Sequence, residues 1–220
     1  MIEATGVSLR YPDDTLALKS FDLHVETGEM VYVTGPSGSG KTSLLKLLLG
    51  IEYPTSGSLK VMGQPIIKGQ TAEIRQLRRI IGPVFQEFRL LKGRTAMDNV
   101  ILGMRFLDFP KGRLKENAIN ALERVGLKQK AFSLVEKLSL GEQQRVAIAR
   151  AVARQPVLIL ADEPTGNLDK DNALNILELL ASFRDTNTSV IITTHATHLI
   201  SSEKNIKHIT INQGNMRWGR

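Results

Sequence analysis

The chain has 220 residues, 42% of them apolar and 23% charged, a balance typical of a soluble globular protein with one compact domain. Its longest apolar stretches, at 44–51 and 157–161, fall far short of the roughly 18 apolar residues that a membrane-spanning helix requires, so we expect no membrane span. The absence of cysteine excludes disulfides and thiolate metal sites.

The net charge of +7 is compatible with attraction to nucleic acid, anionic lipid or nucleotide phosphates. The basic residues are spread along the chain, and the densest groups lie at 75–79 and 111–115. Because nucleic-acid binders usually concentrate their charge, we interpret these groups as solvated helix faces. The first residues, Met1–Thr5, show no basic segment followed by an apolar core, so we expect no secretory signal and a cytosolic address.

The N-terminal part is predicted to form a small antiparallel β-subdomain. Its apolar segments at 2–9 and 17–25 flank a turn at Pro12-Asp13-Asp14. Further along, three β-branched and aliphatic runs bounded by turn residues indicate buried strands, at 30–34, 157–160 and 190–194.

Between these runs lie segments of helical periodicity, at 41–49, 113–125, 141–153 and 172–184. Strands that alternate with helices predict an α/β fold with a mostly parallel sheet. Residues 87–137 are mostly helical in pattern, so we predict an inserted helical lobe there. The whole chain, 1–220, would be one domain whose core takes residues 1–86 and 138–220.

The segment Gly35–Thr42 matches the phosphate-binding pattern G-x-x-x-x-G-K-[ST] and lies between a predicted strand and a predicted helix. Glycines let backbone N–H groups turn towards phosphates, and the helix adds the positive end of its dipole. Lys41 is expected to reach the β- and γ-phosphates during catalysis, and the Thr42 hydroxyl to hold Mg²⁺. The alternative is a glycine-rich turn with a surface lysine. The predicted ATP-binding residues here are Gly35, Pro36, Ser37, Gly38, Ser39, Gly40, Lys41, Thr42 and Ser43.

A second candidate site follows the buried-looking strand at 157–161, which ends in Asp162 and Glu163. Ligands of parallel sheets bind beyond the carboxyl ends of the strands, so this pair is expected beside the phosphate loop. Asp162 would hold Mg²⁺, and Glu163 would act as general base on the attacking water. An acid pair that caps a helix before the Pro164 turn is the alternative. Together the two motifs predict a P-loop NTPase core of the RecA-like type.

The segment 138–145, Leu-Ser-Leu-Gly-Glu-Gln-Gln-Arg, resembles the signature motif of ABC ATPases, in which Leu-Ser-Gly-Gly-Gln or Leu-Ser-Gly-Gly-Glu opens a helix. The resemblance extends over nearly the whole chain. The positions that match the family's adenine-stacking aromatic, glutamine loop, D-loop and switch histidine are Tyr11, Gln86, Asn167-Leu168-Asp169 and His195.

The resemblance implies that two copies pack head to tail around ATP. Ser139, Gly141 and Glu142 of one copy would then close over the γ-phosphate held by the other copy. It also implies that Gln86 contacts Mg²⁺ or water, and that His195 bonds the γ-phosphate and orients the attacking water.

Two positions depart from the family pattern. Leu140 stands where glycine is usual, and its side chain is expected to narrow the closed interface and affect turnover more than nucleotide binding. Ala196 follows the switch histidine where aspartate is usual, a change that we expect to matter less.

Within the family the chain is most similar to the FtsE family of cell-division ATPases, on the segments 85–91, 94–95 and 98–100. That resemblance implies a peripheral protein at the cytoplasmic face of the membrane, with a polytopic FtsX-like membrane partner that carries a conformational signal to cell-wall hydrolases. The segment 86–99, with apolar Phe88, Leu90 and Leu91, would seat a cytoplasmic helix of that partner. The alternative interpretation is that these side chains are core.

Other functions remain open on the sequence. ATPases of lipoprotein release and macrolide export share the segment 163–169, so it does not separate them from the division branch. Nucleic-acid-maintenance ATPases use a similar head, but they usually interrupt it with coiled coils or zinc modules, which this chain lacks, so we expect no nucleic-acid partner. A nucleotide-gated scaffold with weak hydrolysis is a third hypothesis, motivated by Leu140.

Overall fold

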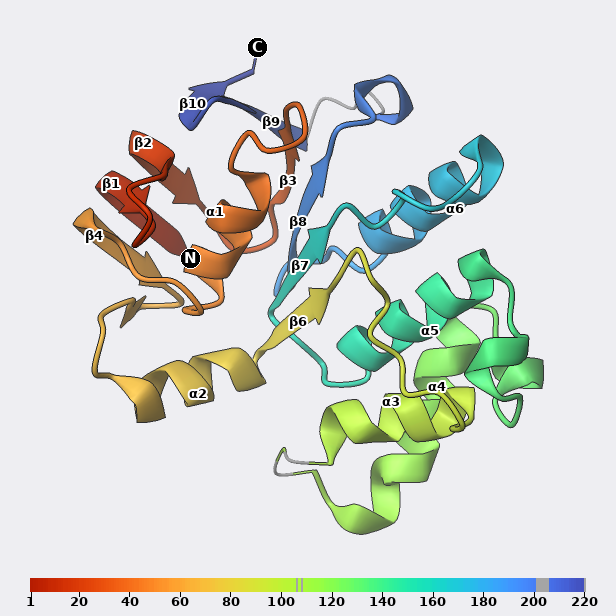
Figure 1. Ribbon diagram of the computed structural model, residues 1–220. Coiled ribbons are helices and arrows are strands. Elements are labelled where there is room, and N and C mark those ends of the chain that lie inside the picture. The colour runs from red at the N-terminus through yellow and green to blue at the C-terminus, as the bar shows by residue number, and fades with distance from the viewer. Residues whose placement is uncertain (106, 108, 201–205, 220) are drawn as a thin grey trace. The chain divides into compact units, whose positions relative to one another are not determined.

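The computed structural model describes residues 1–105, 107, 109–200 and 206–219. The chain divides into two compact units, which are described separately below (Figure 1). The first unit takes residues 1–78 and 184–220, and the second takes residues 79–183.

The first unit contains the predicted antiparallel sheet. Strands β1 and β2 pair antiparallel, with Ile2 opposite Val25, and β1 also pairs antiparallel with β4. Alternate residues at the start of β1 are buried and exposed, as expected for a sheet with one face on a core. The strands, in the order β2-β1-β4-β5, are β2 (Leu16–Val25), β1 (Ile2–Arg10), β4 (Ser56–Val61) and β5 (Gln64–Pro65).

The same unit contains parallel strands around β3 (Met30–Thr34), which is buried along its whole length. β3 lies between β8 (Ser189–Thr194) and β9 (Ile206–Asn212), parallel to both. Strand β10 (Asn215–Trp218) returns antiparallel to β9. The predicted strands at 30–34 and 190–194 are thus confirmed. Because both flanks and both faces of β3 are covered, a continuous apolar run is the pattern that its position requires.

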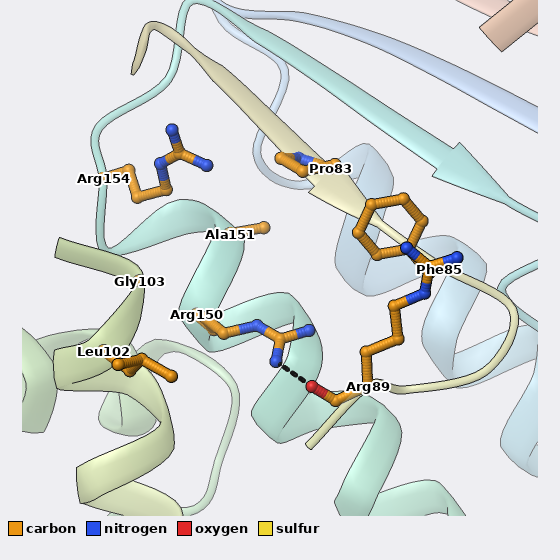
Figure 2. A pocket seen from close by; sticks show the side chains of 8 residues that line it. All are labelled: Pro83, Phe85, Arg89, Leu102, Gly103, Arg150, Ala151 and Arg154. Atoms are coloured by element: carbon orange, nitrogen blue, oxygen red, sulfur yellow. Dashed lines mark hydrogen bonds between the residues drawn. The ribbon is translucent and has the colours of Figure 1, made fainter. Parts of the chain in front are cut away.

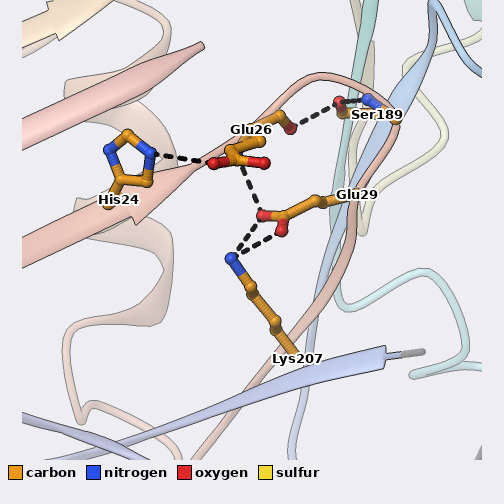
Figure 3. Close-up of polar contacts among 6 residues, drawn as sticks. His24, Glu26, Glu29, Ser189 and Lys207 are labelled. Atoms are coloured by element: carbon orange, nitrogen blue, oxygen red, sulfur yellow. Dashed lines mark hydrogen bonds and ion pairs between the residues drawn. The ribbon is translucent and has the colours of Figure 1, made fainter. Parts of the chain in front are cut away.

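A polar cluster fixes the entrance to β3 (Figure 3). The Lys207 ammonium lies 2.6 Å and 2.7 Å from the two carboxylate oxygens of Glu29. One of those oxygens also accepts the backbone N–H of Glu26 at 3.0 Å. The Ser189 hydroxyl accepts the N–H of Gly28 at 2.8 Å and donates to the Glu26 carbonyl at 3.3 Å. The turn before β3 is therefore tied to the starts of both neighbouring strands.

Three further helical segments accompany these sheets. Helix α1 (Lys41–Leu48) follows β3, α2 (Thr71–Arg79) follows β5, and a 3₁₀ turn (Thr197–Leu199) follows β8. The Arg78 guanidinium donates to the carbonyls of Leu49 and Gly50, so the end of α2 is attached to the end of α1.

The second unit joins a pair of parallel strands to a group of helices. β6 (Ile81–Val84) pairs parallel with β7 (Leu158–Asp162). Helix α5 packs against α3, α4 and α6, and Figure 1 shows α3, α4 and α5 side by side. The helices are α3 (Ala96–Met104), α4 (Leu114–Arg124), α5 (Leu140–Val152) and α6 (Lys170–Ala181). Three 3₁₀ turns complete the unit, at Lys111–Arg113, Lys128–Lys130 and Val135–Lys137.

Local sequence sets where these helices begin. The Thr95 hydroxyl accepts the N–H of Asp98 at 3.1 Å, and the Asp98 carboxylate accepts the N–H of Thr95 at 3.2 Å. This reciprocal capping satisfies two orphan donors at the start of α3. The Thr95 hydroxyl bond lowers the pKa of Asp98, so the cap is intact at neutral pH and is lost as the pH falls through that lowered value. In the described part of the chain, no helix is long and apolar enough to cross a bilayer.

Candidate functional site

The predicted phosphate loop connects the end of β3 to the start of α1. Three of its glycines adopt positive φ angles, 150° at Gly35, 73° at Gly38 and 113° at Gly40. A side chain at Gly35 would collide with the Ile211 carbonyl oxygen, and one at Gly40 would lie 2.5 Å from the Ala17 carbonyl oxygen. The backbone of the loop therefore approaches its neighbours so closely that only glycine fits at 35 and 40.

Lys41 bends back over this loop. Its ammonium donates to the carbonyls of Gly35 at 2.8 Å and Pro36 at 3.0 Å, and the residue is only 5% exposed. Helix α1 begins at Lys41 with no side-chain cap on its first turn. A helix start without a side-chain cap places the positive end of the helix dipole at a glycine-rich loop, so the geometry suits phosphate groups.

Two other predicted residues of the first unit lie near this loop. The Tyr11 hydroxyl is 3.1 Å from the Ser43 hydroxyl on α1, which places the ring beside the first turn of that helix. His195 directly follows β8, where Thr194 is the register partner of Thr34 at the end of β3. His195 and Gly35 thus leave the same edge of the sheet on neighbouring strands, and the His195 side chain is exposed.

In the second unit, β7 ends at Asp162, the first residue of the predicted acid pair, and Glu163 follows it directly. Asp162 is half-buried, whereas Glu163 is 8% exposed and has a positive φ of 45°. The following turn closes with a hydrogen bond of 3.1 Å from the Gly166 N–H to the Glu163 carbonyl. A left-handed conformation at a glutamate is strained, and such strain concentrates at functional sites.

Gln86 lies beside this turn. Its segment follows β6, which is the parallel neighbour of β7, with Val84 opposite Ala161. A side chain at Gly166 would lie 3.3 Å from the Gln86 amide nitrogen, so the exposed Gln86 side chain reaches the turn after Glu163. The structure therefore brings Gln86 and the acid pair together within one unit.

The segment that resembles the signature motif forms the start of α5. The Ser139 hydroxyl accepts the Glu142 N–H at 3.3 Å, and the Glu142 carboxylate accepts the Ser139 N–H at 2.8 Å. This backbone bond lowers the pKa of Glu142, so the cap holds at neutral pH and weakens as the pH falls through the lowered value. Leu140, the first residue of α5, is 52% exposed and leaves the capping intact.

Asn172 is a residue of this region that the sequence interpretation missed. Its N–H donates to the Asp169 carboxylate at 3.0 Å, and its amide donates to the other oxygen at 2.7 Å. A side chain at Gly141 would lie 3.3 Å from the Asn172 amide oxygen. Asn172 thus joins the start of α5 to the segment 167–169, and only the N-cap spacing from Asp169 to Asn172 hints at this in the sequence.

Comparisons with known proteins agree with these motifs. A family model described as ABC transporter matches residues 18–166. The cell division ATP-binding protein FtsE of Mycobacterium tuberculosis is 42% identical over 203 residues, which cover 92% of this chain and 88% of that protein. FtsE of Escherichia coli K12 is 40% identical over 219 residues, which cover 100% of this chain and 98% of that protein.

Solved structures give the same result. A dimeric post-hydrolysis state of the ATP-binding cassette MJ0796, bound to ADP and Pi, has a TM-score of 0.88 and 31% identity and covers 100% of this chain and 98% of that one. The cbiO1 subunit of the cbiONQ ABC transporter complex from Clostridium perfringens has a TM-score of 0.86 and 27% identity, with coverage of 98% and 86%. The α/β fold of P-loop NTPase type and nucleotide binding are thereby confirmed.

We predict that Gly40→Ala weakens ATP binding at least about tenfold, because its new methyl group would collide with the Ala17 carbonyl and displace the loop. Gly63→Ala is the matched control, since Gly63 also has positive φ, at 76°, but has nothing within 4 Å of the added methyl group. Both substitutions place a side chain at positive φ, which costs about 1–2 kcal/mol in the left-handed region and more at the larger φ of Gly40. Titration with a fluorescent ATP analogue measures the difference. Equal affinities would show that the close approach at Gly40 does not matter.

Proposed function

The chain belongs to the ABC transporter family and is an ATP-hydrolysing subunit, and from this premise we propose that it is the division ATPase of an FtsE-type complex. The observation that carries the proposal is the full-length similarity to FtsE, at 40% identity over 219 residues, combined with an uncapped helix start at the phosphate loop. The division role is proposed on that similarity, and the roles of individual residues are proposed on their geometry.

ATP would bind to the first unit through its phosphates and base. The loop 35–40 and the start of α1, with Lys41, Thr42 and Ser43, would surround the phosphates. The Tyr11 ring would stack on the adenine, since it is half-buried beside α1 and carries a ring face suited to a base.

Mg²⁺ would be held by the Thr42 hydroxyl, the Asp162 carboxylate and the Gln86 amide oxygen. These are the hard oxygen ligands that Mg²⁺ prefers, and Gln86 and Asp162 both follow the carboxyl ends of the neighbouring strands β6 and β7. The ion would neutralise charge on the β- and γ-phosphates.

Hydrolysis would depend on Glu163, His195 and Lys41. Glu163 is nearly buried in a strained turn, so its carboxylate is held in place to take a proton from the attacking water. His195 would bond the γ-phosphate and orient that water, and the Lys41 ammonium would stabilise negative charge on the transferred group.

A second copy of the chain would complete the site. In a head-to-tail pair, the N-terminus of α5 would approach the γ-phosphate of the other copy, with Ser139, Gly141 and Glu142 at the contact. The half-exposed Leu140 would stand at the same contact. MJ0796, the similar cassette, is dimeric in its solved structure, which supports this arrangement.

We predict that Glu163→Gln accumulates an ATP-bound dimer, because the amide preserves the shape of the side chain but does not accept the proton from water. Gel filtration with ATP and Mg²⁺ is expected to show a doubled mass, whereas the wild type returns to monomer as ATP is consumed. Glu163→Gln combined with Lys41→Ala is the control, since it should stay monomeric. A monomeric Glu163→Gln variant would contradict the head-to-tail arrangement.

Replacing Leu140 by glycine is expected to accelerate steady-state hydrolysis between about twofold and tenfold, since tenfold corresponds to only about 1.4 kcal/mol. The shorter residue would let the start of α5 come closer to the γ-phosphate. Leu140→Ala separates side-chain size from helix propensity, because alanine removes most of the side chain without the cost of a helical glycine. The assay is run with and without membranes that contain the partner. Unchanged rates in both variants would mean that the closed interface accommodates leucine.

The membrane partner is proposed to be a polytopic protein of the FtsX type, with this chain bound peripherally at the cytoplasmic face of the membrane. The predicted helical lobe, residues 87–137, and the segment 86–99 would form its attachment region. Leu91 is 50% exposed and Phe88 and Leu90 are half-buried, so apolar surface is accessible there for a helix of the partner.

Depletion of the protein in its host is expected to give elongated cells that fail to separate, with length distributions measured by phase-contrast microscopy. Restoring wild-type protein, but not Lys41→Ala, should restore normal length. Mislocalised lipoproteins or increased macrolide sensitivity at normal cell length would instead assign the chain to one of the exporter branches.

A further inference from the structure

A pocket of about 480 Å³ opens in the first unit beside the first half of β9, a volume within the range of roughly 300–1,000 Å³ that small-molecule sites occupy. A smaller hollow of about 260 Å³ lies in the second unit, where the Arg150 guanidinium donates to the Arg89 carbonyl (Figure 2), and it borders the attachment region proposed above. The larger pocket has no role in any motif of the sequence. Its lining residues are His24, Ile206, Lys207, His208, Trp218 and Gly219.

Strand pairing fixes the two aromatic walls of this pocket. His208 is the register partner of the buried Tyr32 on β3, and the two rings stack with their centroids 5.9 Å apart. Trp218 pairs with Ile209 on β9, and the next N–H, of Gly219, donates to the His208 carbonyl at 2.7 Å. Both rings are thus attached to paired strands, so the pocket is formed before a ligand arrives.

One side of the pocket is flat and apolar. Trp218 is 47% exposed, although an indole is among the largest apolar surfaces that a side chain can offer. The Lys207 ammonium lies 5.8 Å from the centroid of the indole ring, at the distance of a cation–π contact, and restrains that ring. The half-buried Ile206 adds an aliphatic surface. A flat, apolar part of a ligand fits such a wall.

The polar groups of the pocket are hydrogen-bond donors. The Trp218 indole N–H and the Lys207 ammonium only donate, and each imidazole of His24 and His208 carries a donor N–H. Among the described residues that line the pocket, none is a carboxylate. A set of donors is satisfied by acceptor oxygens, and best by charged ones.

The neighbouring acids limit how much negative charge the pocket can accept. The Glu29 carboxylate holds the Lys207 ammonium at 2.6 Å and 2.7 Å, and a Glu26 carboxylate oxygen lies 3.7 Å from Nε2 of His24 (Figure 3). Because Glu29 already neutralises Lys207, the pocket suits a ligand with a single negative charge and disfavours a polyphosphate.

We propose that this pocket binds a small aromatic carboxylate, with its ring against Trp218 and Ile206 and its carboxylate hydrogen-bonded by His208 and His24. The site is separate from the phosphate loop, which follows the carboxyl end of β3, whereas the pocket lies beside the first half of β9. The proposal does not depend on the division role.

The test uses the full chain and three small probes. Trp218 is the only tryptophan of the chain, so its fluorescence reports on this pocket alone. Benzoate is the complete probe, benzyl alcohol has the ring without the charge, and acetate has the charge without the ring. Benzoate is expected to bind at least about tenfold more tightly than either of the others, because each lacks one of the two kinds of contact.

Variants at one lining histidine then locate the carboxylate. His208→Leu removes the imidazole donor but keeps an apolar side chain on Tyr32, so it should weaken benzoate binding at least about tenfold. His208→Gln retains a donor N–H and is expected to keep part of the affinity. His198→Leu is the matched control, since it makes the same change at an exposed histidine outside the pocket and should bind like the wild type.

Thermal melting establishes that every variant is folded, and titration with a fluorescent ATP analogue should give the wild-type affinity in all of them. Equal responses to the three probes, no response to benzoate, or benzoate binding that His208→Leu leaves within twofold would each overturn this inference. None of these outcomes bears on the proposed function, because neither the probes nor the variants involve the ATP site.

Discussion

The phosphate loop depends on the backbone of strands that are distant in sequence. Ile211, near the end of β9, faces Gly35 with its carbonyl, and the Gly214 N–H donates to the Ser39 carbonyl at 3.0 Å. Thr34, the last residue of β3, lies beside Thr210 with hydroxyls 3.2 Å apart. Because Thr210 and Ile211 belong to β9, which is paired with β3 and β10, and Gly214 lies in the turn that joins β9 to β10, the loop is held against a backbone that the sheet itself fixes.

In the second unit, helix caps hold the starts of α5 and α6 in place. Ser139 and Glu142 satisfy each other at the start of α5, and Asp169 caps α6 through Asn172. Since Asn172 also contacts the position of Gly141, the two helix starts are fixed relative to each other. A leucine at position 140 fits this arrangement because its side chain is 52% exposed and takes no part in either cap. Leu140 is therefore expected to affect the contact of this chain with another molecule and not the folding of the chain itself.

The sequence predicts the strands and helices that have a clear apolar pattern. It misses those whose residue types favour no single structure. Strand β3 and helix α1 lie within one residue of prediction, because a buried parallel strand is apolar throughout and the loop motif marks its end. Strand β6 was missed because its four residues include Gly82 and Pro83, which usually argue against a strand. For helix α2 the sequence indicated only a solvated helix face at 75–79 and no full helix, because just two of its residues, Ile74 and Leu77, are buried. Contacts such as that of Gly35 with the Ile211 carbonyl are backbone contacts, which no residue type reveals.

Helix α5 gives the second unit a direct mechanical connection between its two surfaces. Its thirteen residues span about 20 Å. Ser139 caps the end expected to meet a nucleotide, and Arg150, near the other end, holds the loop after Gln86. The middle of the helix, including Gln144 and Ile148, is fully buried, so it cannot bend or slide without disrupting the core. A displacement at one end of α5 is therefore expected to be transmitted along the helix, from the capped signature segment to the loop after Gln86.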